Sequence, residues 1–143
     1  MDATDLGLDT RLTLLVAGVV FFWALVLGVV KYVQILRSPE GHAHPYTDIA
    51  HRAALMYSFA TLLIAVFVEL SAFPQGVDLT AVVVLEVFFI ASIGSYMLHG
   101  LRKDTTNQLV DPPPLIRAFM VALIVGELGA FGVLLIGFTI AAF

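Results

Sequence analysis

The sequence contains no cysteine among its 143 residues. This absence excludes disulfides, thiolate catalysis, iron–sulfur ligation and thioester-linked lipids, and any metal must be held by histidine or carboxylate side chains. Charge is also scarce, because Asp, Glu, Lys and Arg together make up 13% of the chain. With a net charge of −4 there is no basic face for phosphate groups, so we do not expect nucleic-acid binding.

Hydrophobic residues are abundant. They make up 60% of the chain, and the mean hydropathy is +1.00, which is more apolar surface than a water-soluble domain of this length buries in one core. The charged residues lie mostly in short stretches between long apolar runs, a pattern typical of chains that cross a bilayer. Residues 1–10 carry aspartates and no basic residue, so we predict no cleaved targeting peptide.

The apolar runs predict an all-α fold, an integral membrane four-helix bundle that forms a single domain over residues 1–143. About 20 apolar residues are needed to cross a bilayer core about 30 Å thick. Prolines and glycines mark the breaks between the runs, and Thr47 or Asp48 is expected to cap the second helix. The predicted helices cover about residues 12–36, 48–73, 78–101 and 115–143.

Lysine and arginine are distributed unevenly between the two sides of the predicted bundle. One side has only Arg11, and the positive-inside rule therefore places the first and third loops in the cytoplasm. Both chain ends then face outward, and we expect a multi-pass protein of the inner (cytoplasmic) membrane. The six basic residues of the cytoplasmic side are Lys31, Arg37, Arg52, Arg102, Lys103 and Arg117.

Histidines gather at the predicted cytoplasmic side. His42, His44, Asp48 and His51 fall close together at the entry to the second helix, and His99 closes the third. An iron in haem needs one axial histidine on a rigid element, and His51 is better placed for that than the loop histidines. One alternative is a zinc or copper site made by His42, His44 and His51. The other is that these histidines are interfacial side chains that bind only water and headgroups.

Two further groups of polar residues lie within the predicted spans. Tyr96 and His99 are three residues apart and share a face near the cytoplasmic end, although a tyrosine there is also typical of an interfacial aromatic belt. Glu69, Glu86 and Glu127 are intramembrane carboxyl groups, which are costly enough to suggest function. They predict either protonated acids that hold helices together or a path for protons.

Short motifs in the middle half of the chain resemble the styrene oxide isomerase group, which forms a family of small four-helix membrane proteins with the hydroxylaminobenzene mutases. The motifs occur in the same order as in that family. They are Ser38-Pro39-Glu40-Gly41 before the second helix, Ala50-His51 in its first turns, and Gly94-Ser95-Tyr96 followed by a loop that contains Asn107.

This resemblance implies a haem b whose ferric iron acts as a Lewis acid on the epoxide oxygen of a small hydrophobic substrate. It also implies a homo-oligomer, a trimer with haem near the subunit contacts. His51 would be the axial ligand, with His44 as the alternative, and Tyr96 would face the substrate. Tyr57 stands about where the family has an asparagine, and with His99 it would line the open side of the haem.

Two other functions are compatible with the sequence. The small size and the intramembrane acids are also typical of a non-catalytic accessory subunit in a respiratory or transport complex. A proton-coupled carrier or channel that uses Glu86 or Glu127 is a third hypothesis, and it requires an oligomer to enclose a path.

Overall fold

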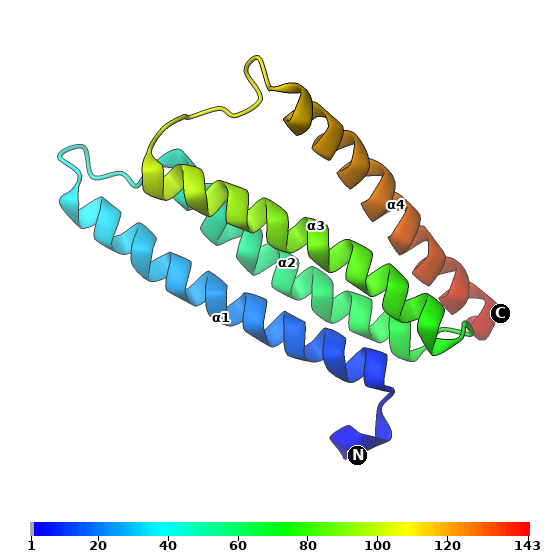
Figure 1. Ribbon diagram of the computed structural model, residues 1–143. Helices are drawn as coiled ribbons and strands as arrows, with labels where there is room; N and C mark the ends of the chain where they lie inside the picture. Colours follow the sequence, from blue (N-terminus) through cyan, green and yellow to red (C-terminus); the bar gives the residue numbers. More distant parts are fainter. Residues whose placement is uncertain (1) are drawn as a thin grey trace.

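Four long helices make up almost the whole chain (Figure 1). The computed structural model describes residues 2–143, without the side chain of Ala3, and no residue in that range lies in a strand. All four helices are long and apolar enough to cross a membrane, which confirms the prediction of an all-α, multi-pass membrane protein. After a 3₁₀-helix, Ala3–Asp5, come α1, Leu8–Arg37, α2, Pro45–Glu69, α3, Gln75–Arg102, and α4, Pro114–Ala142.

Helix α2 begins earlier than the sequence predicts. Its N-cap is His44, whose Nδ1 accepts a hydrogen bond from the Tyr46 N–H at 3.3 Å, so the prediction of Thr47 or Asp48 as the cap is wrong. Pro45 occupies the first helical position, where proline is favourable because an N–H would have no helical partner. Pro45, which the sequence analysis places in a helix-breaking loop, is therefore the first residue of α2.

Three other helix ends differ from the predicted ones for similar local reasons. Helix α3 begins at Gln75 rather than near residue 78, with Pro74 as its N-cap. Helix α1 begins at Leu8 rather than near residue 12, because the carboxylate of Asp9 suits the positive end of a helix dipole. Helix α2 ends at Glu69 rather than near Phe73. There the Ser71 hydroxyl accepts a hydrogen bond from the Phe73 N–H at 3.1 Å and replaces the next helical bond.

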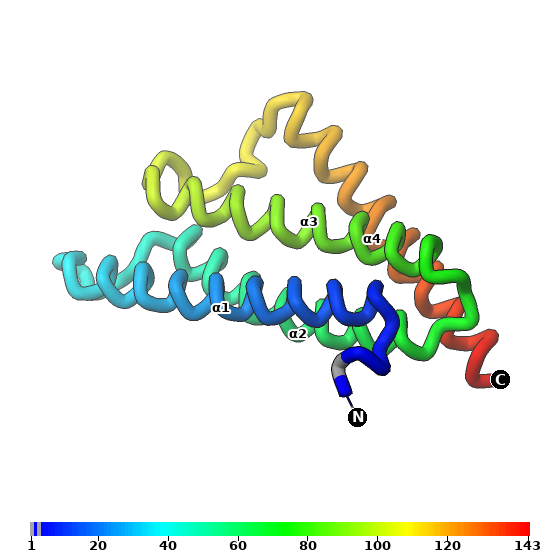
Figure 2. The backbone as a smooth tube through the Cα atoms, turned by 60° about the horizontal axis from the view of Figure 1, so that its bottom comes forward, coloured from blue at the N-terminus to red at the C-terminus, as the bar shows by residue number. Residues whose placement is uncertain are grey.

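The four helices are not packed equally. Helices α1, α2 and α3 lie side by side, whereas α4 packs on the others mainly along its C-terminal half and diverges from them toward its start (Figures 1 and 2). Within the first half of α4, Phe119 still meets Phe88 of α3, with ring centroids 5.8 Å apart. The buried residues of α4 are Ala130, Leu134 and Gly137, all in its C-terminal half. Ala130 and Leu134 join residues of α2 and α3 in one core cluster, and a second cluster connects α1, α2 and α3.

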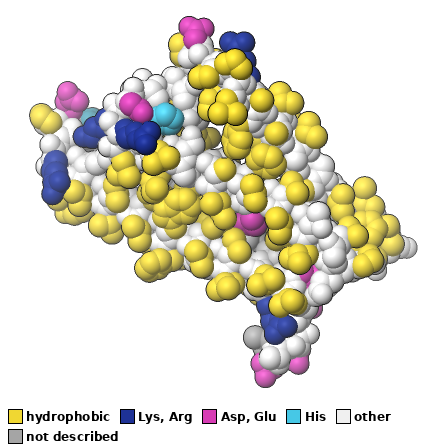
Figure 3. Space-filling view, in the orientation of Figure 1, with side chains coloured by type: hydrophobic (Ala, Val, Ile, Leu, Met, Phe, Trp, Pro, Cys, Tyr) yellow, Lys and Arg dark blue, Asp and Glu magenta, His cyan; other side chains and the backbone are white. Residues whose placement is uncertain are grey.

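The two ends of the bundle differ in charge. Hydrophobic side chains cover much of the helices between the ends (Figure 3). The basic end is defined here as the end that carries loops 38–44 and 103–113, and the acidic end as the one that carries both chain termini and the 70–74 turn. The basic end holds Lys31, Arg37, Arg52, Arg102, Lys103 and Arg117, and the acidic end holds Asp2, Asp5, Asp9, Glu69 and Asp78.

Candidate functional site

His51 is held between α1 and α2, about two turns inside α2 from the basic end. Its Nδ1 lies 2.9 Å from the carbonyl oxygen of Ala24, a residue that is completely buried in α1. The ring also lies against Gly28, one turn further along α1, where an added Cβ would come within 2.9 Å of the ring carbon Cε1. The groove for this ring therefore requires glycine at position 28.

The Ala24 contact determines which ring nitrogen of His51 carries a proton. A carbonyl oxygen only accepts hydrogen bonds, so Nδ1 must be the donor. In the neutral imidazole this leaves a lone pair on Nε2, the form in which histidine binds metals. A backbone carbonyl bound to the other nitrogen is also the usual partner that orients a metal-binding histidine.

His44 has the opposite arrangement. Its Nδ1 accepts the hydrogen bond from the Tyr46 N–H, so in the neutral ring the proton is on Nε2 and no lone pair remains for a metal. His44 contributes instead to the start of α2. The hydrogen bonds therefore favour His51 over His44 as an axial ligand.

The other two histidines donate hydrogen bonds at the basic end. His42 Nδ1 contacts the Glu40 carbonyl oxygen in the exposed loop. His99 Nδ1 lies 2.7 Å from Asp104 Oδ1, and this hydrogen bond lowers the pKa of the Asp104 carboxyl below its ordinary value. Within residues 2–143, no three His, Asp or Glu side chains lie together in a group that could hold a metal ion.

An ion-pair network joins α1 and α2 one turn from His51. Asp48 Oδ1 lies 2.5 Å from Lys31 Nζ, and Asp48 Oδ2 lies 3.0 Å from an Arg52 nitrogen. Because Asp48 and Arg52 both belong to α2, the Lys31 contact is the one that connects the two helices. It fixes the spacing of α1 and α2 beside the His51 ring.

Tyr57 and Tyr96 meet on a different side of α2. They line a cavity of about 320 Å³, here called the tyrosine cleft, whose walls also include Arg52 and Met56. The Tyr57 ring stacks on that of Phe89, with ring centroids 4.2 Å apart. The complete lining is Ile49, Arg52, Ala53, Met56, Tyr57 and Tyr96.

The polar groups near the tyrosine cleft include one that the sequence did not place there. Glu127 on α4 lies within electrostatic range of the Tyr57 and Tyr96 hydroxyls, although it is not among the residues that line the cleft. Glu127 Oε1 is buried without a hydrogen-bond partner in the described chain. The sequence did not indicate that Glu127 lies near the cleft, because the loop before α4 does not determine which face of that helix turns toward α2 and α3.

Tyr46 is a second residue that the sequence analysis missed. Its ring centroid lies 5.9 Å from that of Tyr96 and 5.4 Å from that of His99, and its hydroxyl accepts a hydrogen bond from the Gln108 N–H at 2.7 Å. It therefore supports Tyr96 from the basic end. The only signal was the Pro45-Tyr46 pair at the start of α2. Asn107, in the same loop, accepts a hydrogen bond from the Leu109 N–H at 3.0 Å.

The structure separates the predicted ligand from the predicted tyrosines. His51 and Tyr57 are six residues apart on α2, so they project about 120° from each other. His51 faces α1, whereas Tyr57 faces α3, and the tyrosine cleft does not include His51. The structure brings Tyr96 and Tyr57 together, and His51 lies elsewhere in the same chain.

The remaining intramembrane acids have separate partners. Glu86 Oε1 accepts a hydrogen bond from the Thr61 hydroxyl at 2.8 Å, and Glu86 Oε2 is buried without a partner in the described chain. Glu69 Oε2 lies 3.4 Å from the Gly7 N–H at the acidic end. No Lys or Arg in residues 2–143 forms an ion pair with Glu69, Glu86 or Glu127.

Comparison of the chain with protein families, with curated proteins and with solved structures gave no match. The likeness to the styrene oxide isomerase family therefore stays a resemblance of short motifs. His51 and the tyrosine cleft are the two candidate functional features of the described chain.

Proposed function

We propose that this chain is a haem b-binding membrane isomerase that converts a small hydrophobic aryl epoxide into a carbonyl compound. The observation that carries the proposal is the hydrogen bond from His51 Nδ1 to the Ala24 carbonyl, with Gly28 making room for the ring. That arrangement supplies an oriented Nε2 lone pair within a membrane span, as an axial haem ligand requires. Ligation by one histidine needs no further side-chain ligand.

When bound, the ferric haem would act as a Lewis acid on the epoxide oxygen, and the reaction needs no net electron transfer. The residues of the chain would orient the substrate. The hydroxyl groups of Tyr57 and Tyr96 can donate hydrogen bonds to its oxygen, and the stacked Phe89 and Tyr46 rings limit their motion. The apolar walls of the tyrosine cleft suit the aryl part of the substrate and exclude water.

A homo-oligomer is part of this proposal, because His51 and the two tyrosines point away from each other within one chain. A neighbouring copy could bring its tyrosine cleft to the side of the bundle where His51 lies. The family resemblance implies a trimer. A His51 variant and a Tyr96 variant, each inactive alone, should then restore activity when they are co-expressed.

The orientation proposed for the chain places the basic end in the cytoplasm and both termini outside. It is supported by the six basic residues at that end against one at the other. The membrane would be the inner (cytoplasmic) one. Reporter fusions at the termini and in the 103–113 loop test this orientation.

An absorption spectrum of the purified protein tests haem binding directly. We expect a Soret band that is lost in His51→Ala and retained in the matched control His44→Ala, because of these two residues only His51 has a free Nε2 lone pair. The haem-loaded wild-type protein should isomerise an aryl epoxide. Tyr96→Phe should lower that activity without removing the Soret band. A colourless wild-type preparation that takes up no added haem would refute the proposal.

A non-catalytic haem-binding or accessory subunit is the second candidate. It is favoured by the exposure of α4, because only 6% of an apolar 18-residue stretch of that helix is buried within the chain. A larger membrane partner could cover that surface. Co-purification of the chain with such a partner, together with no epoxide isomerisation by the haem-loaded protein, would support this candidate over the enzyme.

A further inference from the structure

The largest cavity described for the chain lies at the basic end, on the side of α1 away from His51. It has a volume of about 850 Å³, within the range of small-molecule sites, and it is here called the loop pocket. Val30, Val33 and Arg37 line it, and these residues recur at helical spacing on one face of α1. Gly28, against which His51 packs, is not part of that face.

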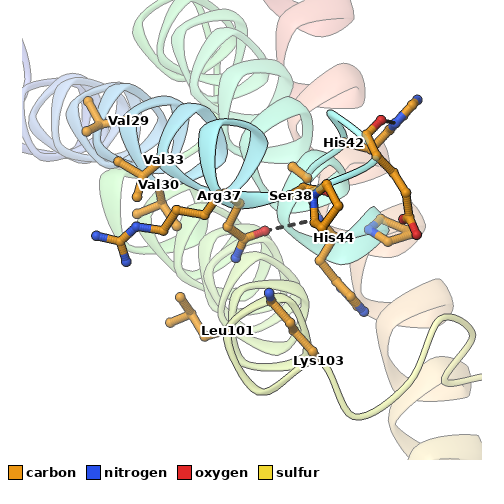
Figure 4. Close-up of a pocket in the computed structure, with 14 residues that line it drawn as sticks. Val29, Val30, Val33, Arg37, Ser38, His42, His44, Leu101 and Lys103 are labelled. Carbon is orange, nitrogen blue, oxygen red and sulfur yellow. Dashed lines mark hydrogen bonds between the residues drawn. The ribbon is translucent and has the colours of Figure 1, made fainter.

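The walls of the loop pocket change from apolar to cationic along α1. Val29, Val30 and Val33 line its inner part, with Leu101 from α3 (Figure 4). Arg37 lies eight residues beyond Val29, which is about 12 Å along a helix. The pocket therefore extends from the apolar part of the span to the polar rim of the basic end.

Two cations and one carboxylate line the polar part of the pocket. Arg37 and Lys103 form no ion pair with another residue of the described chain, and Glu40 is the only acidic side chain among the lining residues. In Figure 4, Lys103 lies between Leu101 and His44, on the boundary of the apolar and polar walls. The polar part of the pocket therefore suits an anionic group.

The backbone around the pocket is fixed before any ligand binds. Gln34 donates a hydrogen bond to the Gly100 carbonyl at 3.2 Å and accepts one from the His44 N–H at 3.0 Å, so one side chain links α1, α3 and the loop. Gly100 packs directly on Thr47, where an added Cβ would lie 2.6 Å from the backbone nitrogen. This contact sets the end of α3, and Lys103, close to the loop.

Lys103 occupies a position that favours glycine. It is the C-cap of α3, with a left-handed φ of 54° and a ψ of 34°, and glycine is the usual residue at such a helix end. A lysine there retains a cation at a cost to the backbone. Sparsely populated backbone conformations of this kind gather at ligand sites.

We propose that the loop pocket binds one anionic amphiphile of the surrounding membrane, such as an acidic phospholipid. Its phosphate group would lie between Arg37 and Lys103, and the first part of an acyl chain would lie against the valines of α1. A soluble anion would satisfy the cations but leave the apolar wall in contact with water. A zwitterionic lipid would bring its own cation close to Lys103.

Native mass spectrometry of the purified full-length chain tests this site. The probes are phosphatidylglycerol and phosphatidylcholine with identical acyl chains. We expect one retained phosphatidylglycerol per chain, with binding weakened about fivefold by Arg37→Gln or by Lys103→Gly, and roughly 25-fold by both. Lys103→Gly also relaxes the left-handed cap, so it should weaken lipid binding without lowering the thermal unfolding midpoint.

The matched control is Arg102→Gln, which removes a charge next to Lys103 but outside the pocket. Binding in this variant should stay within about twofold of wild type. An equal loss in Arg102→Gln would show general attraction to the surface and overturn the proposal, as would equal retention of phosphatidylcholine. Displacement of the lipid by millimolar inorganic phosphate would overturn the amphiphile in favour of a free anion. Arg37→Gln leaves the backbone unchanged, so its result decides the matter even if Lys103→Gly does not fold.

Discussion

Replacing Gly28 with alanine tests the packing that orients His51. The added Cβ would lie 2.9 Å from Cε1 and 3.3 Å from Nδ1 of the ring, so the ring must move away from α1 and from the Ala24 carbonyl. Loss of that hydrogen bond costs roughly 1 kcal/mol, and overpacking costs typically 1–3 kcal/mol. The higher helix propensity of alanine offsets about 1 kcal/mol of this.

Gly18→Ala is the matched control, because it lies on the same helix and an added Cβ there meets no atom within 4 Å. Both variants share the propensity gain, so the difference between them isolates the contact with His51. We expect Gly28→Ala to be less stable than Gly18→Ala by about 2–4 kcal/mol. The free energy of unfolding can be measured by titrating SDS into the detergent-solubilised protein and following helicity.

The same pair of variants reports on haem. Loss of the partner that orients a metal-binding histidine typically lowers metal affinity by 10–100-fold, so Gly28→Ala should titrate with haem much more weakly than Gly18→Ala. If the two variants agree within about 0.5 kcal/mol in unfolding, the packing described for Gly28 is wrong. If they differ in stability but bind haem equally, the packing holds and the role of His51 as ligand does not.

Three further predictions concern other contacts. Gly100→Ala should destabilise the protein by roughly 2–3 kcal/mol relative to Gly94→Ala in the same SDS titration, because only the first meets backbone atoms of α2. Thr61→Val should cost about 1–2 kcal/mol by removing the hydroxyl bound to the α3 glutamate, whereas Thr61→Ser should be nearly neutral. Hydrogen bonding from His99 lowers the pKa of Asp104 in the folded chain, so the contact stabilises fully above about pH 4 and is lost as the pH falls through that lowered pKa. Unfolding midpoints measured from pH 2 to pH 7 should therefore fall more steeply on the acid side in wild type than in Asp104→Asn, and parallel curves would contradict this reasoning.

Much of the fold could be predicted from the sequence because each apolar run is long enough to span a bilayer by itself. Helix ends were less predictable, since they depend on single hydrogen bonds. Pro45 was taken as a helix breaker, but the ring nitrogen of His44 caps the chain just before it. No hydropathy pattern distinguishes these two roles of proline.

The candidate site was predictable only in part. Helical spacing on α3 indicated that Tyr96 lies near the basic end, and the family resemblance suggested Tyr57. The structure places these two rings together and adds Tyr46 beside Tyr96. Which ring nitrogen carries the proton in His51 and in His44 was not predictable, because it depends on the backbone atom that each ring contacts. For His51 that atom belongs to Ala24, which is 27 residues away in the sequence.

The one-sided attachment of α4 has a consequence for how a substrate would arrive. Toward the basic end α4 diverges from α2 and α3 (Figure 2), and the helices expose many apolar side chains, so a molecule dissolved among the lipid tails would reach the bundle laterally, without crossing the aqueous phase. Each methylene group favours the hydrocarbon layer over water by about 0.8 kcal/mol, or roughly fourfold in concentration. The bilayer would thus act as a reservoir that enriches apolar compounds beside the protein, and chemical selection would begin with partitioning.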